Sequence, residues 1–297
     1  MTHVLTLVAP VGGGLDPATL EAAGAALRSA GAELGDSVWL APGLACDRFF
    51  GGLDAAEAEA VARRALGGLP IDLGAQPVEG RRKALLLADM ESTIIGQELL
   101  DELGRLAGLG GQIAEITERA MRGEVDFAEA LRFRVGQLAG RPASLLEEVR
   151  ALITFTPGAR ELVRTMRKHG AYTMLVSGGF DRFAESVAEN CGFDAFQANH
   201  LILDGARLAG RVREPVLDRG AKLAALEEAA ARLKVPLFAA AAVGDGANDL
   251  PMLQAAGLGV AYRGKPAVAA AARFRIDHGD LTGLLYFQGY RREEFCT

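Results

Sequence analysis

Cysteine and long apolar segments are both scarce in this sequence. Its three cysteines, Cys46, Cys191 and Cys296, lie far apart and in no metal-ligand spacing, which argues against a disulfide framework and against a zinc site. No stretch approaches the ~18 consecutive apolar residues typical of a transmembrane helix. No Lys or Arg precedes the first apolar run, so the start of the chain does not resemble a secretory signal. We therefore expect a soluble, cytoplasmic protein.

Positive charge is also in deficit, because 32 Lys and Arg residues face 38 Asp and Glu residues and the formal net charge is −6. The mean field of such a protein repels polyanions, which argues against nucleic acid or an anionic membrane surface as a partner. A small phosphorylated metabolite stays compatible, because a local pocket can be cationic within an acidic protein. Half of the 297 residues are apolar, so the chain can bury a substantial core and has room for two domains.

The first part of the chain predicts a small domain at residues 1–80. From His3 to Gly74 the pattern is strand, helix, two short strands, helix and a last extended piece. That order predicts an α+β sandwich of ferredoxin-like type. Its fold is similar to ACT-like amino-acid-binding domains, so by fold analogy a regulatory or dimerising role is a hypothesis, and a homodimer stays open. The polar stretch 75–83 contains Pro77 and Gly80 and suits a linker.

The second part, residues 81–297, predicts an α/β domain with a doubly wound parallel sheet. The run KALLLAD fits a strand buried on both faces of such a sheet. Helical spacing without a strand signal follows, which predicts a small helical insertion at about 97–155. From Thr156 onward, strands and helices alternate. The pair Asp204-Gly205 interrupts this alternation and predicts a β-hairpin appended to the domain.

Small or acidic residues follow directly after three apolar strands of this domain. The three segments are Asp89 to Thr93, Ser177 to Phe180 and Gly244 to Leu250. Ligands bind at the carboxyl edge of open α/β sheets, so we expect these segments to converge there. Lys222 opens the helix between the second and third segments. By itself Lys222 would be an ordinary solvated residue, and only this position favours a functional role.

This arrangement is suited to phosphoryl transfer. Two acidic strand ends facing each other are costly unless a divalent cation neutralises them, and oxygen ligands suit Mg²⁺. Ser177, with the backbone N–H groups of Gly178 and Gly179 before a helix start, forms an anion site, and Lys222 adds a positive charge. In such a site a carboxylate can attack phosphorus and form an acyl phosphate.

The set D-M-E-S-T, S-G-G, a lone Lys and G-D-G-x-N-D, in this order, resembles the four motifs of the haloacid dehalogenase-like phosphatases. The resemblance extends from Lys83 to the end of the sequence. The helical insertion is similar to the cap of the phosphoserine phosphatase family. Glu98 lies nine residues beyond Asp89, and the segments V-D-F and L-R-F-R-V place Phe127 and Arg134.

The resemblance implies how the core residues act. Asp89 would be the nucleophile and an Mg²⁺ ligand, and Glu91 the general acid and base, which also offers its backbone carbonyl to the metal. Asp245 would be a further metal ligand. Asn248 and Asp249 would order metal-bound water and the groups around the metal.

The resemblance also implies the substrate and the residues that bind it. The reaction would be hydrolysis of O-phospho-L-serine to serine and phosphate through an aspartyl-phosphate intermediate. In the cap, Arg134 would pair with the substrate carboxylate, Glu98 would take its ammonium group and Phe127 would exclude water. Ser177 and Lys222 would hold the phosphoryl oxygens. The complete substrate-binding set is Glu98, Phe127, Arg134, Ser177, Gly178, Lys222 and Asn248.

One residue departs from the family pattern, because Glu91 stands where the family usually has Asp. Glutamate has the right chemistry for an acid and base. Its extra methylene moves the carboxyl by roughly 1 Å, and a misplacement of that size can cost about a hundredfold in rate. The sequence therefore predicts activity, at a rate that depends on whether the backbone compensates for the longer side chain.

Alternative interpretations stay open at this point. The protein could act on another small phosphomonoester, or transfer the phosphoryl group to an alcohol such as homoserine. It could also be a binding or regulatory protein with a decayed site, in which Glu91 is the lesion. Among the cap residues, Glu98 could simply stabilise a helix start, Phe127 could be cap core, and one of Arg132 and Arg134 is expected to be a solvated partner of nearby acids.

Overall fold

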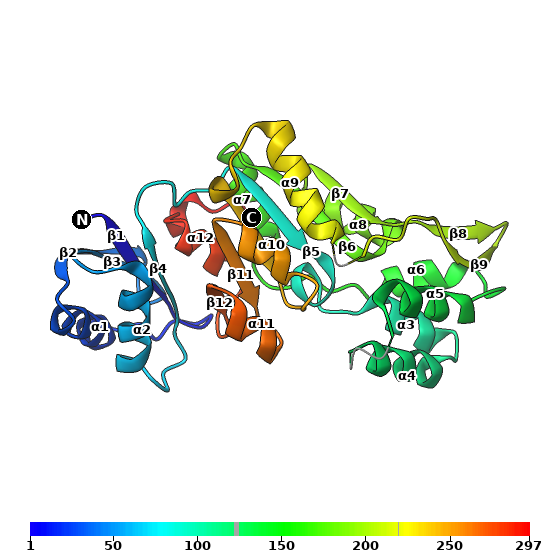
Figure 1. The fold of residues 1–297 in the computed structure, drawn as a ribbon, viewed down its shortest axis with the longest axis horizontal. Coiled ribbons are helices and arrows are strands. Elements are labelled where there is room, and N and C mark those ends of the chain that lie inside the picture. Colours follow the sequence, from blue (N-terminus) through cyan, green and yellow to red (C-terminus); the bar gives the residue numbers. More distant parts are fainter. Residues whose placement is uncertain (122–124, 219) are drawn as a thin grey trace.

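Two larger sheets and a two-stranded hairpin organise the computed structural model (Figure 1), which describes residues 1–121, 125–218 and 220–297. The first sheet is antiparallel, with strand order β2-β3-β1-β4. It is formed by β1 (His3–Val8), β2 (Glu33–Ala41), β3 (Ala45–Gly51) and β4 (Asp72–Pro77). With α1 (Pro17–Ser29) and α2 (Ala55–Ala65) the chain order is βαββαβ, which confirms the ferredoxin-like prediction.

Local sequence explains where the two helices of this unit begin. The carboxylate of Asp16 accepts a hydrogen bond from the backbone N–H of Thr19 at 2.7 Å, and Pro17 occupies the first helical position. Asp54 caps α2 in the same way through the N–H of Ala56 at 2.8 Å. Both arrangements satisfy N–H groups that a helix start leaves unpaired.

The second sheet is parallel, with strand order β12-β11-β10-β5-β6-β7. Its central strand β5 (Leu85–Asp89) is buried along its whole length, as the unbroken apolar run predicts. The other strands are β6 (Tyr172–Phe180), β7 (Ala195–Asn199), β10 (Ala240–Gly244), β11 (Leu258–Tyr262) and β12 (Phe274–Ile276).

Helices cover both faces of the parallel sheet. Leu86 and Ala88 of β5 pack with α7 (Ala159–Lys168), α8 (Asp181–Cys191) and α12 (Gly283–Phe287). Leu85 and Leu87 point to the other face, where they pack with α9 (Ala221–Leu233), α10 (Leu250–Ala255) and α11 (Pro266–Ala271). This three-layer arrangement confirms the prediction of a doubly wound α/β core.

In the described part of the chain, four α-helices lie between β5 and α7 and form the helical insertion. They are α3 (Leu99–Leu106), α4 (Gly110–Met121), α5 (Phe127–Gln137) and α6 (Ser144–Arg150). The chain leaves and re-enters the core side by side, because Ile95 and Phe155 form an antiparallel bridge. We refer to this helical insertion as the cap.

The predicted hairpin is present as β8 (Leu201–Asp204) and β9 (Arg207–Val212). We expected it to be appended to the sheet domain, and it leaves that domain to pack on the cap (Figure 1). The N–H of Gly140 donates to the carbonyl of Leu208, and the N–H of Leu208 donates to the carbonyl of Arg141, both at 2.8 Å. The cap is therefore supported from the core side by this hairpin as well as by its own chain connections.

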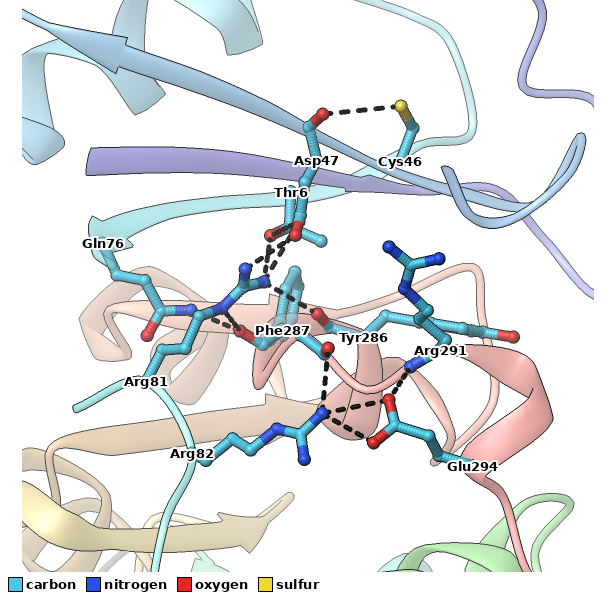
Figure 2. A network of polar contacts seen from close by, with 11 residues as sticks. Thr6, Cys46, Asp47, Gln76, Arg81, Arg82, Tyr286, Phe287, Arg291 and Glu294 are labelled. Carbon is cyan, nitrogen blue, oxygen red and sulfur yellow. Dashed lines mark hydrogen bonds and ion pairs between the residues drawn. The ribbon is translucent and has the colours of Figure 1, made fainter. Parts of the chain in front are cut away.

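The antiparallel sheet is fixed to the core through α12, whose residues are all buried. Figure 2 shows the linker residue Arg81 pointing into this joint, where its guanidinium forms an ion pair with Asp47 of β3 at 2.6 Å. Arg81 also donates to the backbone carbonyls of Tyr286 and Phe287 at 3.2 Å each. Gln76 donates to the same Phe287 carbonyl at 2.6 Å. The stretch expected to be a linker thus contacts both β3 of the antiparallel sheet and α12 of the core.

The joint also includes a close approach of backbone and ring. A Cβ atom at Gly74 of β4 would lie 2.5 Å from the ring of Phe274 in β12, so only glycine allows this contact.

Among the described residues, no helix has the length and apolarity needed to cross a bilayer.

Candidate active site

The predicted strand ends meet at one edge of the parallel sheet, because β5 pairs with β6 on one side and with β10 on the other. A cavity of about 140 Å³ lies there between the core and the cap. Predicted site residues from both parts line it, namely Asp89, Glu91, Glu98, Phe127, Arg134, Gly178, Asp245 and Asn248. Ser177 and Lys222 line a smaller adjoining cavity. The structure therefore brings the predicted residues together.

Three buried carboxylates form the floor of the site. Oxygen atoms of Asp89, Asp245 and Asp249 lie within 4.8 Å of one another. The ammonium nitrogen of Lys222 lies 2.6 Å from Asp89 Oδ1 and 2.5 Å from Asp249 Oδ1. One buried lysine facing three buried carboxylates leaves an excess of negative charge, which is costly in a low-dielectric interior.

The electrostatic strain is visible in the direction of the pKa shifts. Burial, followed by the charge of Asp249, raises the pKa of Asp89 well above its usual value. Burial also raises the pKa of Asp245. Burial alone would lower the pKa of Lys222, but the charges of Asp89 and Asp249 outweigh it and raise that pKa. The site is thus suited to an additional cation.

A divalent cation fits this donor set, because carboxylate oxygens are the ligands that Mg²⁺ prefers. Asp249 is fully buried and already uses both oxygens: Oδ1 faces Lys222, and Oδ2 accepts from the N–H of Gly246 at 2.8 Å. Asp89 and Asp245 are therefore the carboxylates with oxygens left for a metal. The ligand roles expected for Asp89 and Asp245, and the supporting role expected for Asp249, stay predictions that these free and occupied oxygens support.

The phosphate-binding segment differs in detail from the expectation. We expected the apolar strand to end before Ser177 and the N–H groups of Gly178 and Gly179 to be available. Instead β6 continues to Phe180, with an irregular register against β7 between Val176 and Phe180. The N–H of Gly179 donates to Ser177 Oγ at 2.9 Å, because the irregular backbone turns this group back onto the serine hydroxyl. That hydrogen bond orients the nearly fully buried Ser177 side chain.

Glu91 lies in the tight turn Met90–Ile94 that follows β5. Its Oε1 accepts a hydrogen bond from the N–H of Leu99, at the start of the cap, at 2.7 Å. Burial, and next the charge of Glu98, raise the pKa of Glu91 to about 8. A carboxyl with such a pKa is protonated at neutral pH, which suits a general acid.

The predicted cap residues Phe127, Arg134 and Glu98 all line the cavity. Phe127 lies over Gly178, where an added Cβ would be 2.9 Å from its ring. Arg134 lines the cavity and donates to the backbone carbonyl of Ala130 at 3.3 Å. Glu98 is the residue immediately before α3, at a helix start as expected, and it accepts from Ser92 Oγ at 2.7 Å.

The choice between the two cap arginines is clear in the structure. Arg132 is exposed and forms an ion pair with Glu214 at 2.8 Å. Arg134 points the other way, toward the cavity. Burial lowers the pKa of Arg134, and the charge of Asp101 opposes this shift most strongly. Arg132 is therefore the solvated partner of an acid, as expected for one of the two.

Sequence analysis missed three polar residues of this site. Lys265 lies with its ammonium nitrogen 3.8 Å from Asp245 Oδ2, and Asp101 lines the cavity. Asn199, 2% exposed, donates to the carbonyl of Gly178 and accepts from the N–H of Leu217, both at 2.8 Å. Lys265 follows β11 and Asn199 ends β7, so a systematic search of every strand's carboxyl end would have found both.

Comparison with known proteins places this architecture in a family. A family model described as haloacid dehalogenase-like hydrolase matches residues 86–254, more than half of the chain. A phosphoserine phosphatase of Streptomyces coelicolor is 43% identical over 227 residues, which cover 76% of this chain and 55% of that relative. The chain thus spans about half the length of that relative.

Solved structures extend the similarity. A probable phosphoserine phosphatase from Vibrio cholerae, in unliganded form, superposes with a TM-score of 0.78 at 32% identity, covering 99% of this chain and 88% of that chain. A phospho-aspartyl intermediate analogue of phosphoserine phosphatase superposes with a TM-score of 0.65 at 37% identity, covering 69% of this chain and 99% of that chain. From its sequence match, its core topology and its carboxylate cluster, the chain belongs to the haloacid dehalogenase-like hydrolase family.

Proposed function

We propose that this protein hydrolyses O-phospho-L-serine to serine and phosphate. The observation that carries the proposal is one cavity in which Asp89 of the core, paired with Lys222, faces Glu98, Phe127 and Arg134 of the cap; Lys222 itself lines the adjoining cavity. The names of the Streptomyces and Vibrio relatives support the same substrate. We further propose that residues 1–80 and 81–297 are separate domains, with the cap at about 97–155.

In the first step a carboxylate oxygen of Asp89 attacks phosphorus and forms an aspartyl phosphate while the bond to the seryl oxygen breaks. Lys222 and Ser177 hold the phosphoryl oxygens by charge and by hydrogen bonding. Glu91, protonated at neutral pH because its pKa is raised to about 8, gives its proton to the departing seryl oxygen.

In the second step Glu91, now a carboxylate, takes a proton from water, and the resulting nucleophile attacks the aspartyl phosphate. Phosphate leaves, Asp89 is regenerated, and Glu91 is protonated again. A divalent cation held by Asp89, Asp245 and the backbone of Glu91 would supply positive charge that offsets the phosphoryl and carboxylate charges.

Specificity comes from the cap. The Arg134 guanidinium is planar and suited to pair with a carboxylate through two parallel hydrogen bonds, and Glu98 can accept from an ammonium group. Phe127, lying over Gly178, excludes water from the phosphoryl site. An amino-acid phosphate satisfies both charges of the cap, whereas a sugar phosphate leaves them unpaired.

The test is phosphate release from phosphoserine with and without Mg²⁺, beside phosphothreonine, glycerol phosphate and glucose 6-phosphate. We expect selective, Mg²⁺-dependent turnover of phosphoserine that is absent in Asp89→Asn. Turnover of the other esters without phosphoserine would refute the substrate. Formation of a homoserine phosphate when homoserine is added would show transfer in place of hydrolysis.

A further inference from the structure

The carboxyl group of Glu91 connects the catalytic core to the first helix of the cap. Leu99 is the first residue of α3, so its N–H is one of the groups that a helix leaves without an internal partner. The preceding residue, Glu98, makes no side-chain capping bond. Glu91 Oε1 accepts from this N–H at 2.7 Å. A residue of the core thus supplies the hydrogen bond at the start of α3 that the preceding residue, Glu98, does not provide.

The other oxygen of the same carboxyl lies against the opposite wall of the site. A Cβ atom added to Gly179 in β6 would be 2.9 Å from Glu91 Oε2. The carboxyl is therefore held between the start of α3 and the phosphate-binding segment. A second polar contact joins the same regions, because Ser92 Oγ donates to Glu98 Oε1 at 2.7 Å.

The length of the side chain decides whether this contact exists. Glu91 is anchored in the turn Met90–Ile94, directly after the central strand. An aspartate there would end one carbon–carbon bond earlier, which retracts its carboxyl by up to roughly 1.5 Å. A donor–acceptor distance of 2.7 Å would then approach about 4 Å, beyond hydrogen-bonding range.

We propose that Glu91 is a positioning residue for the cap as well as the acid–base group, and that its extra methylene serves the bond to Leu99. The same hydrogen bond then places the acid and holds the helix that leads into the substrate-binding cap. Because α3 is already held in place before substrate arrives, less conformational entropy is lost when substrate binds. The role of Glu91 as acid and base rests on the proposed function. Its role in positioning the cap, the cap half of the proposal, rests on the hydrogen bond to Leu99 alone.

Amide hydrogen exchange of Leu99 in the substrate-free protein tests the cap half without any assay of activity. Glu91→Gln keeps the length and an acceptor oxygen but cannot act as an acid, whereas Glu91→Asp keeps the acid and loses the reach. We expect exchange at Leu99 to stay within twofold of wild type in Glu91→Gln and to become at least tenfold faster in Glu91→Asp. Protection that survives in Glu91→Asp, or is lost equally in both variants, would overturn the inference.

A second pair of variants removes the donor instead of the acceptor. Proline is tolerated at the first position of a helix and lacks an N–H, and Glu98 (φ −98°, ψ 102°) lies outside the helical region that a following proline disfavours. Both Leu99→Pro and Leu99→Ala lose the buried leucine side chain, so their difference isolates the N–H group.

We expect the KM for phosphoserine to be about fivefold higher in Leu99→Pro than in Leu99→Ala, as for the loss of a hydrogen bond between neutral groups. Equal KM values in the two variants would contradict the proposal. If wild type turns over no phosphoserine, the proposed function fails, and the exchange experiment on the Glu91 variants still decides the inference.

Discussion

The ammonium nitrogen of Lys222 lies 2.6 Å from Oδ1 of Asp89, and both side chains are buried at the end of β5. The carboxylate expected to attack phosphorus is therefore held by the cation expected to bind the phosphoryl oxygens. Lys222 is shared with Asp249, so it does not fully neutralise either partner. The site is arranged for a reaction, and this arrangement has a cost in stability.

Asp89→Asn separates function from stability. We expect phosphate release to be lost, because an amide cannot serve as the nucleophile. In metal-free buffer we expect the free energy of unfolding to rise by about 1 kcal/mol, because one of the mutually repelling buried charges is removed. Chemical denaturation in EDTA measures the change, with the exposed Asp36→Asn as control. A destabilised Asp89→Asn would show that the ionised aspartate stabilises the fold.

Divalent metal should stabilise the protein through the same carboxylates. A ligand at a hundred times its dissociation constant stabilises the native state by about 2.7 kcal/mol, so Mg²⁺ is expected to raise the Tm of wild type. Asp245→Asn removes one of the two carboxylates whose oxygens are not already used, and the Mg²⁺-dependent shift should shrink or vanish. Thermal scans with Mg²⁺ and with EDTA decide this. An undiminished shift in Asp245→Asn would place the metal elsewhere.

Arg134 should determine recognition of the substrate carboxylate, whereas Arg132 should not. Removing an interaction of a charged group costs about 1.5 to 3 kcal/mol, so Arg134→Leu is expected to lower kcat/KM for phosphoserine by more than tenfold. Arg132→Leu is the matched control from the same helix, because its guanidinium is exposed and paired with Glu214. Glycerol phosphate, which has no carboxylate, should show no such difference. Equal losses in both variants would contradict the assignment of Arg134.

Local patterns explain how much of this site could be predicted. The buried run of β5, the Asp204-Gly205 turn and the small residues around Ser177 and Asp245 each have a direct physical signature in the sequence. Because parallel strands end at a shared edge, these local signals were enough to place the carboxylates together. The motif spacing then separated Arg134 from Arg132, although both have the same local chemistry.

Long-range contacts explain what could not be predicted. The docking of Arg81 depends on Asp47 in β3 and on two backbone carbonyls of α12. These carbonyls belong to Tyr286 and Phe287, which lie more than 200 residues from Arg81 in sequence. A polar stretch with proline and glycine has the composition of a free linker whether or not such partners exist. The hydrogen bond between Glu91 and Leu99 likewise depends on the folded position of the cap.

The buried pair of Arg81 and Asp47 should stabilise the joint between the two sheets (Figure 2). Asp47→Ala leaves the buried Arg81 charge without its partner, which is expected to cost about 3 kcal/mol or more. Glu294→Ala breaks the neighbouring and more exposed pair with Arg82, which should cost less than about 1 kcal/mol. Urea unfolding of both variants gives the comparison. Similar small losses would mean that the apolar contacts of α12 hold the joint without the ion pair.

Asn199 should hold the phosphate-binding segment in place although it lies outside the four motifs. Its amide nitrogen donates to the carbonyl of Gly178, and its oxygen accepts from the N–H of Leu217 on the segment that leads to Lys222. Asn199→Asp keeps the shape and the acceptor but loses the donor, so a carboxylate faces the Gly178 carbonyl. We expect this repulsion to displace the segment that binds the phosphoryl oxygens.

The measurable consequence is weaker binding of phosphate itself. In Asn199→Asp we expect the inhibition constant of inorganic phosphate to rise about tenfold, which corresponds to about 1.4 kcal/mol, with a similar loss in kcat/KM. Asn190→Asp is the control, because Asn190 is exposed and its side chain donates within α8 to the carbonyl of Ser186. An unchanged phosphate inhibition constant beside a lower Tm would mean that Asn199 supports the fold and does not position the phosphate site.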